Sequence, residues 1–425
     1  MREKNFLFRE LIVTFAENNI LAMRNIEIHN FGPIKEGYIK VKNVTVFMGN
    51  QGSGKSTAAK LISTFAWIEK FLFRFSATIK HPEEKLKSDF KKYLEYHRIE
   101  TYLKDDTEIV YYGDSYRIAY KNGKICVNKN GDKYLLPKIT YFPAERNFIS
   151  SIKKSKENNG FKLWSQSLQE FKEIFQEAKE NLKSGSAMKL PISGTSIEYN
   201  QLNDILYVKG EDYKIPLSDS ASGFQSFVPM YVVAEYLSKI TEREQEMDSS
   251  QREMFIQQST EILNNPNYTQ EQKNILLSRL AGKSNIKSVF NIIEEPEQNL
   301  FPSSQRNMLF ELLKFNNASA DNTMIITTHS PYIVGNLTLA IKAATLYSKT
   351  TDNEARAKIT AIIPEKSSIN AEDVVIYEFD DKTRTINELE HQNGLPSDND
   401  YLNTALGDTN DFFSDLLDLE DKICK

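Results

Sequence analysis

The chain has 425 residues, a formal net charge of −5 and 40% hydrophobic residues, which suit one large elaborated domain or two domains with a packed core. Because the net charge is mildly negative, the composition does not indicate a nucleic-acid-binding protein. Two cysteines, Cys126 and Cys424, are too few for a disulfide framework or a cysteine metal cluster.

Neither a membrane protein nor a secreted one is indicated. No apolar run approaches the roughly 20 residues of a membrane span. Near the N-terminus, Arg9 and Glu10 interrupt the apolar Phe6-Leu7-Phe8 before it can form a signal-type segment. We therefore expect a cytoplasmic protein in which residues 1–22 form a short amphipathic helical extension.

The main domain begins with β structure. Residues 24–31 alternate as a strand, Gly32-Pro33 makes a turn, and residues 37–41 return as a second strand. An apolar run from Val44 to Met48 then predicts a third strand, and residues 58–62 are compatible with a helix.

Between that third strand and the helix lies the stretch Gly49-Asn50-Gln51-Gly52-Ser53-Gly54-Lys55-Ser56-Thr57. It has the GxxxxGK[ST] spacing of a phosphate-binding loop in its required strand–loop–helix context. Glycines let backbone N–H groups surround phosphate oxygens at a helix N-terminus. Lys55 can reach the β- and γ-phosphates, and the Ser56 hydroxyl can bind Mg²⁺. The alternative is a glycine turn with an exposed lysine.

Helical and β segments follow in turn. Residues 58–104 are mainly helical, and their lysine-rich part, 80–92, is either a solvated helix face or a phosphate-binding patch. Residues 107–128 alternate with period two between glycine-containing turns, which predicts antiparallel strands. Residues 135–142 form one more strand, which ends in Pro143-Ala144-Glu145-Arg146. We expect Arg146 to cap it through a surface ion pair, with contact to phosphate or a partner as the alternative.

The next segment of interest is Ser222-Gly223-Phe224-Gln225, which follows a predicted hairpin over 205–217 and leads into an apolar helix over 227–237. Ser222 is expected to N-cap this helix, and Gly223 permits close backbone approach to a phosphate. The alternative is that Ser222 only caps a core helix. The flanking stretches 148–190 and 238–285 are polar and helical in pattern.

A buried-strand candidate, residues 288–293, ends at Glu294-Glu295-Pro296-Glu297. After a phosphate-binding loop, the first carboxylate can hold Mg²⁺ directly or through water, and the second can polarise the attacking water. Pro296 stops the strand so that both carboxylates lie near the loop. The alternative is a solvated acidic loop.

Another strand, residues 323–327, ends at Thr328-His329-Ser330-Pro331. The His329 imidazole can hydrogen-bond the γ-phosphate or the attacking water, and a purely structural histidine is the alternative. The tail contains a strand at 374–379, a turn at Asp380-Asp381 and an acidic C-terminal helix.

The order of these motifs resembles that of the ATP-binding-cassette (ABC) type of ATPase, and more narrowly the SMC-like, OLD-type bacterial ATPases. The resemblance implies an α/β P-loop NTPase of the ABC-ATPase type, with a mixed central sheet with helices, an antiparallel β-subdomain and a helical insertion. The expected organisation is the extension 1–22 and an ATPase domain 23–425 that contains β-subdomain elements (23–48 and 107–142), helical insertions (148–195 and 238–285) and a C-terminal α/β tail (336–425).

In the family that the chain resembles, two ATPase domains bind head to tail around ATP and Mg²⁺. Ser222, Gly223 and Gln225 would then act on the partner copy's ATP, Glu295 would be the catalytic base, and His329 the switch histidine. Ser56 and Glu294 would hold the metal. The signature departs from the commonest pattern, because Phe224 replaces its second glycine and no leucine precedes Ser222.

About 90 residues follow Gly335, fewer than the Toprim nuclease domain of OLD-type proteins requires, so no nuclease is expected in this chain. Stand-alone ATPases of this pattern resemble the ATPase subunits of bacterial anti-phage systems, which restrain and release a separate nuclease or toxin. The expected function is therefore an ATPase that dimerises and controls such an effector. The alternatives are an SMC-like ATPase that clamps DNA in repair, and a slowly hydrolysing ATP-bound scaffold.

Overall fold

The computed structural model describes residues 24–75, 82–131, 134–151, 164–182, 187–192, 194–242, 249–266, 268, 273 and 287–423. The predicted extension 1–22, Cys424 and parts of both predicted helical insertions lie outside these residues. In the described part, the largest feature is an eleven-stranded sheet with the order β6-β5-β4-β1-β2-β15-β14-β3-β13-β12-β7. Its strands are β1 (Asn25–Phe31), β2 (Ile34–Lys40), β3 (Val44–Gly49), β4 (Glu108–Tyr112), β5 (Tyr116–Lys121), β6 (Lys124–Lys129), β7 (Lys138–Phe142), β12 (Val289–Glu294), β13 (Thr323–Thr328), β14 (Val374–Phe379) and β15 (Thr385–Glu388).

The sheet has a parallel part and an antiparallel part. Strands β7, β12, β13, β3 and β14 are parallel neighbours, and β3 and β12 are buried along their whole length, as expected for strands covered on both faces. Strands β2, β1, β4, β5 and β6 form the antiparallel wing. Strand β15 joins the two parts because it pairs antiparallel with β14 and parallel with β2.

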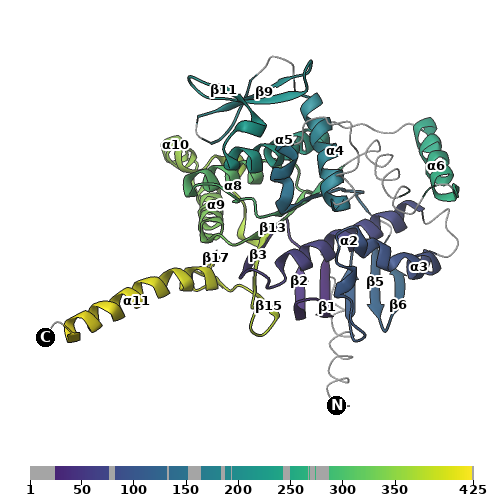
Figure 1. The fold of residues 1–425 in the computed structure, drawn as a ribbon, viewed down its shortest axis with the longest axis horizontal. Coiled ribbons are helices and arrows are strands. Elements are labelled where there is room, and N and C mark those ends of the chain that lie inside the picture. Colours follow the sequence, from purple (N-terminus) through teal and green to yellow (C-terminus); the bar gives the residue numbers. More distant parts are fainter. Residues whose placement is uncertain are drawn as a thin grey trace, which may run out of the picture.

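Helices cover both faces of the parallel part (Figure 1). Successive strand residues point to opposite faces, so Val46 of β3 enters one apolar core and its neighbour Phe47 enters the other. The described helices are α2 (Lys55–Phe75), α3 (Pro82–Glu95), α4 (Gln166–Glu180), α5 (Ser222–Glu242), α6 (Ser249–Asn264), α8 (Pro302–Asn316), α9 (Pro331–Lys349), α10 (Asn353–Ile362) and α11 (Tyr401–Ile423). Helix α2 packs into the core of Phe47, whereas α4, α5, α8 and α9 pack into the core of Val46.

Shorter elements complete the fold. Strands β8 (Met188–Lys189), β9 (Ser196–Asn200), β10 (Ile205–Lys209) and β11 (Lys214–Pro216) form a separate antiparallel sheet, and β16 (His391–Gln392) pairs with β17 (Leu395–Pro396). The predicted fold class, an α/β P-loop NTPase with a mixed sheet and an antiparallel β region, is confirmed. None of the helices in the described ranges is both long and apolar enough to cross a membrane.

The tail is part of the central sheet. Strand β14 pairs with the phosphate-loop strand β3, with Phe379 opposite Gly49. The predicted turn at Asp380-Asp381 connects β14 to β15, and the Asp380 carboxylate accepts the N–H groups of Lys382 and Thr383. Residues more than 300 positions apart therefore meet beside the loop Gly49–Thr57.

Candidate functional site

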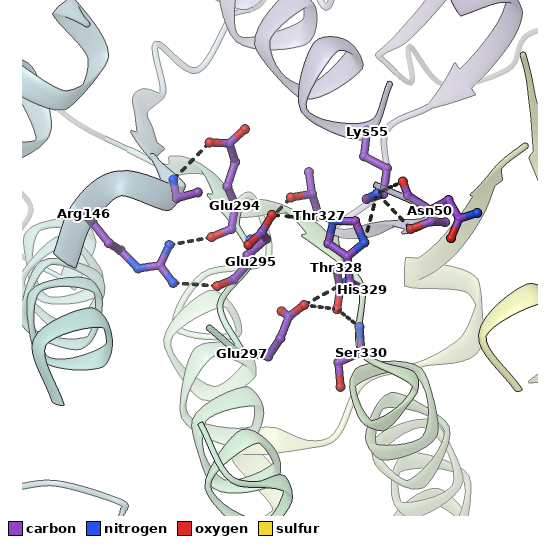
Figure 2. Close-up of polar contacts among 12 residues, drawn as sticks. Asn50, Lys55, Arg146, Glu294, Glu295, Glu297, Thr327, Thr328, His329 and Ser330 are labelled. Carbon is purple, nitrogen blue, oxygen red and sulfur yellow. Dashed lines mark hydrogen bonds and ion pairs between the residues drawn. The ribbon is translucent and has the colours of Figure 1, made fainter. Parts of the chain in front are cut away.

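Four polar segments meet at one edge of the sheet. Strands β3, β13, β12 and β7 are parallel neighbours, so the residues that follow them lie side by side at their carboxyl ends. Figure 2 shows Lys55, Glu294, Glu295, His329 and Arg146 gathered there. The structure thus brings together the predicted phosphate loop, the paired carboxylates and the histidine.

The loop Gly49–Thr57 has the backbone that its glycines predict. Gly49 and Gly54 have φ values of +139° and +108°, which side chains rarely tolerate. A Cβ at Gly49 would lie 2.5 Å from the carbonyl oxygen of Phe379, and one at Gly54 would lie 2.8 Å from Cγ1 of Ile34. The loop is therefore held closely between β14 and the β1–β2 turn, with α2 beginning at Lys55.

The Lys55 ammonium is buried inside this loop. Its Nζ donates to the carbonyl oxygens of Gly49 (2.9 Å) and Asn50 (2.6 Å), and it lies 3.5 Å from Nδ1 of His329. Burial lowers the pKa of Lys55 to about 8, against the opposing influence of Glu295 and Glu297. A buried cation at a helix N-terminus is a favourable position for an anion.

Two further groups make the loop suitable for a phosphate with its metal. The Ser53 hydroxyl is buried without a hydrogen-bond partner, as expected for a group that binds a phosphate oxygen. Ser56 and Glu294 line one cavity of about 560 Å³. A hydroxyl and a carboxylate are oxygen ligands that Mg²⁺ prefers, and Mg²⁺ usually takes its other ligands from water and phosphates. No cluster of three or more His, Cys, Asp or Glu side chains suited to a metal occurs among the described residues.

The paired carboxylates have different environments. Glu294 is buried, and its Oε2 accepts the Ala144 N–H at 3.1 Å, which ties the end of β12 to the segment after β7. Glu295 is one-third exposed and has a φ of +43°, an uncommon conformation for a residue with a side chain. Such backbone conformations concentrate at functional sites, because the surrounding structure must impose them. Here the Glu295 N–H donates to the Thr327 carbonyl at 2.9 Å.

Glu295 and His329 face each other across the site. Oε1 of Glu295 lies 3.6 Å from Nε2 of His329. The imidazole, followed by Arg146 and Lys55, holds the pKa of Glu295 below its ordinary value, although partial burial opposes this. Glu295 is therefore ionised at neutral pH and exposed enough to meet a water molecule.

A third carboxylate, Glu297, positions the histidine. Its Oε1 accepts the Thr328 hydroxyl at 2.8 Å and the His329 N–H at 2.9 Å, whereas its Oε2 is buried without a hydrogen-bond partner. Burial raises the pKa of Glu297. We did not predict this role, although Glu297 belongs to the same acidic motif. The sequence signal for this role was the position of Glu297 directly after Pro296.

The expected surface ion pair of Arg146 is wrong. Arg146 is fully buried, and its guanidinium donates to four carbonyl oxygens, those of Pro143 (3.1 Å), Ser226 (3.1 Å), Glu294 (2.5 Å) and Glu295 (2.6 Å). Burial lowers its pKa to about 10. Five N–H donors in a fixed planar fork suit this cluster of acceptors, so Arg146 joins β12 to α5.

The segment Ser222–Gln225 is not brought to the phosphate loop. No hydrogen bond in the described ranges joins it to Gly49–Thr57. The predicted N-cap at Ser222 is also corrected: α5 begins at Ser222, Ala221 precedes it, and the Ala221 carbonyl accepts the N–H groups of Phe224 and Gln225. The Ser222 side chain is exposed.

The other two residues of this segment contact their own chain. The Gln225 amide donates to the carbonyl oxygens of Ser218 (3.0 Å) and Ser220 (2.7 Å), which folds the preceding turn against α5. A Cβ at Gly223 would lie 2.8 Å from the Asn299 carbonyl, so the close approach that glycine permits here is to the chain's own backbone.

Sequence reasoning also missed a contact on the other side of the loop. Nδ2 of Asn50 donates to Oδ2 of Asp381 at 2.9 Å and to the Tyr401 hydroxyl at 2.7 Å. The phosphate loop is thereby connected to the β14–β15 turn and to the first residue of α11. No local pattern marks this contact, because its partners are more than 330 positions apart.

Comparison with protein-family models gives a match to the AAA ATPase domain over residues 22–184 and 75–334. Comparison with curated proteins gives no match. Similar solved structures include the SMC head domain from Thermotoga maritima (12% identity, 74% of this chain and 91% of that chain, TM-score 0.30). Another is the Smc head domain with an extended coiled coil, bound to the C-terminal domain of ScpA, from Pyrococcus furiosus (10% identity, 95% of this chain and 100% of that chain, TM-score 0.35). A third is a nucleotide-free ATP-binding cassette from an ABC transporter (10% identity, 88% of this chain and 93% of that chain, TM-score 0.28).

Proposed function

Because this chain belongs to the AAA ATPase domain family, we propose that it binds and hydrolyses ATP with Mg²⁺, dimerises around the nucleotide and regulates a separate effector protein. The observation that carries the proposal is the convergence of Lys55, Glu295 and His329 at the carboxyl edge of the parallel strands. Phosphoryl transfer to water uses a P-loop lysine and a group that orients the water, and an imidazole can hydrogen-bond the γ-phosphate.

Binding is assigned to the loop Gly49–Thr57. Lys55 supplies the cation, the backbone N–H groups at the start of α2 supply donors, and the buried Ser53 hydroxyl binds a phosphate oxygen. Ser56 and Glu294 would hold Mg²⁺, which neutralises charge on the β- and γ-phosphates when bound.

Hydrolysis is assigned to Glu295 and His329. The ionised Glu295 carboxylate orients a water molecule and accepts a hydrogen bond from it. The water oxygen forms a bond to the γ-phosphorus while the bond to the bridging oxygen of ADP breaks, and the proton that the water loses passes to Glu295. His329, held by Glu297, donates a hydrogen bond to the γ-phosphate.

The second half of the site is assigned to another copy of the chain. Ser222 is exposed at the start of α5, and its own chain does not bring it to the phosphate loop. This supports a head-to-tail dimer in which Ser222, Gly223 and Gln225 contact the partner's ATP. The most specific part of the proposal is that the effector is a nuclease or toxin in anti-phage defence. This part rests on the resemblance to OLD-type ATPases.

Phosphate release from purified protein tests the proposal, with wild type compared with Glu295→Gln. The variant should retain ATP affinity, lose turnover by about 100-fold or more and accumulate as an ATP-bound dimer in light scattering. Unchanged turnover in Glu295→Gln would remove the assignment of the catalytic base. Hydrolysis in wild type that is too slow to measure would favour the ATP-bound scaffold.

Titration with labelled duplex DNA at two salt concentrations tests the DNA-clamping alternative. A clamp requires ATP-dependent affinity that falls steeply with salt. The formal charge of −5 does not favour this result.

A further inference from the structure

Helix α11 extends away from the rest of the molecule (Figure 1). Every residue from 410 to 420 is exposed. The exposed fraction is 66% for Phe412, 62% for Leu416, 49% for Leu419 and 79% for Ile423. Monomeric proteins rarely leave a contiguous row of large apolar side chains in water, so this exposure calls for a function.

The apolar residues form one stripe. Phe412, Leu416, Leu419 and Ile423 follow the spacing i, i+4, i+7 and i+11, which places them on one side of an α-helix. Phe413 and Leu417 extend the same side and are also exposed, at 63% and 47%. Asp411 and Asp418 lie on the opposite side, whereas Asp415 borders the stripe, three residues from Phe412 and four from Leu419, and all three are exposed.

The charge of this helix restricts what can cover the stripe. Residues 401–423 contain six carboxylates and one lysine, so their formal charge equals that of the whole chain. One carboxylate, Glu420, lies within the stripe, because it is four residues from Leu416 and three from both Leu417 and Ile423. An occupant that buries the stripe must place a cation opposite Glu420, since an unpaired buried carboxylate is costly.

We propose that α11 is a docking helix for a different protein, one that offers an apolar groove carrying lysine or arginine side chains. This is the helix-in-groove mode of recognition, in which residues spaced i, i+4 and i+7 act as anchors. A second copy of α11 is a poor occupant, because stripe-to-stripe pairing brings Glu420 and the flanking aspartates of two acidic helices together. The identification of the occupant as the regulated effector rests on the function proposed above.

The base of the helix is fixed beside the phosphate loop. Asp400 caps α11, because its Oδ1 accepts the N–H groups of Leu402 (2.9 Å) and Asn403 (3.0 Å). The Tyr401 N–H donates to Oε1 of Glu378 at 2.6 Å, and the Tyr401 hydroxyl accepts the bond from Asn50. The helix that carries the stripe is therefore connected at its first residue to the phosphate loop by one hydrogen bond.

Fluorescence anisotropy with two synthetic helical peptides tests the proposal on the full chain. The basic probe carries leucines at helical spacing flanked by lysines, and the acidic probe replaces those lysines with glutamates. Wild type should bind the basic probe at least tenfold more tightly than the acidic one.

Leu416→Ser/Leu419→Ser should weaken binding of the basic probe by tenfold or more, whereas the matched opposite-face variant Asn410→Ala/Ser414→Ala should bind as wild type does. Glu420→Lys should reduce the preference for the basic probe.

Equal affinity for both probes, or equal binding by the stripe variant and the opposite-face variant, would overturn the proposal. Sedimentation of the same variants addresses the other occupants. Loss of ATP-dependent self-association in Leu416→Ser/Leu419→Ser would identify a second copy, and binding of wild type to phosphatidylcholine vesicles would identify a lipid surface. Phosphate release should stay at the wild-type rate in the stripe variant, so the result is independent of whether the chain hydrolyses ATP.

Discussion

The phosphate-loop edge and the Ser222–Gln225 segment each include the first residues of a helix, α2 and α5, but the fold uses them differently. At the edge, Lys55, Glu295 and His329 contact one another from three different elements. In the segment, Ser222 is exposed, and the Gln225 side-chain amide donates to two carbonyl oxygens of the turn before it. The polar groups of the first region are brought together within one chain, whereas Ser222 in the second remains exposed.

The largest expected effect falls on the phosphate-loop edge. Lys55→Ala should weaken ATP binding by about 100-fold or more, because it removes the buried cation that the phosphates meet. Equilibrium binding of a fluorescent ATP analogue measures this. Full affinity in the variant would mean that the loop is not the nucleotide site.

Arg146→Met should lower the free energy of unfolding by about 3 kcal/mol or more, because four buried carbonyl oxygens lose their shared donor. Urea titration followed by circular dichroism measures the change. Arg146→Lys is the matched control for charge, and it should recover only part of the loss because one ammonium cannot reproduce the planar fork. Full recovery by lysine would contradict the assignment.

Ser222→Arg addresses the second region alone. The variant should bind ATP as wild type does but lose ATP-dependent dimerisation and about tenfold or more of its turnover, because the added bulk blocks the approach of another copy. Light scattering and phosphate release measure both effects. Gln392→Arg, at another exposed position, is the control. Normal dimers in Ser222→Arg would place the interface elsewhere.

The smallest effect is one of pH. Because burial lowers the pKa of Lys55 to about 8, the cation is fully present well below pH 8 and is lost as the pH rises through that value. ATP affinity should therefore fall by up to about tenfold per pH unit above pH 8, with proton uptake on binding. Calorimetry in buffers of different ionisation enthalpy measures the uptake. Lys55→Ala should abolish it, and an uptake that persists there would assign it to another group.

The motifs could be predicted because their signals are local. The glycines of Gly49–Thr57, the alternation of 107–128 and the carboxylates after an apolar run each lie within a short window. Arg146 could not be interpreted correctly in this way, because its acceptors are backbone carbonyls up to 149 positions away. Any residue type can supply a backbone carbonyl, so the sequence contains no mark of it.

The same reason applies to the position of the tail. Strand β14 was predicted as a strand, but nothing local indicates that it pairs with β3 or that Asp381 and Tyr401 contact Asn50. Sheet order follows from which apolar faces pack together across the whole domain. The N-cap assigned to Ser222 was wrong by one residue, which is within the range where helix ends are hard to place.

The guanidinium of Arg146 has a consequence for how two copies would meet. By bonding the carbonyls of Glu294, Glu295 and Ser226, it connects the phosphate-loop edge directly to the first turns of α5. A surface whose orientation is set in the free monomer loses less conformational entropy when it associates. If two copies associate around ATP as proposed, Arg146 would already fix the orientation of the start of α5 relative to the phosphate-loop edge before they meet.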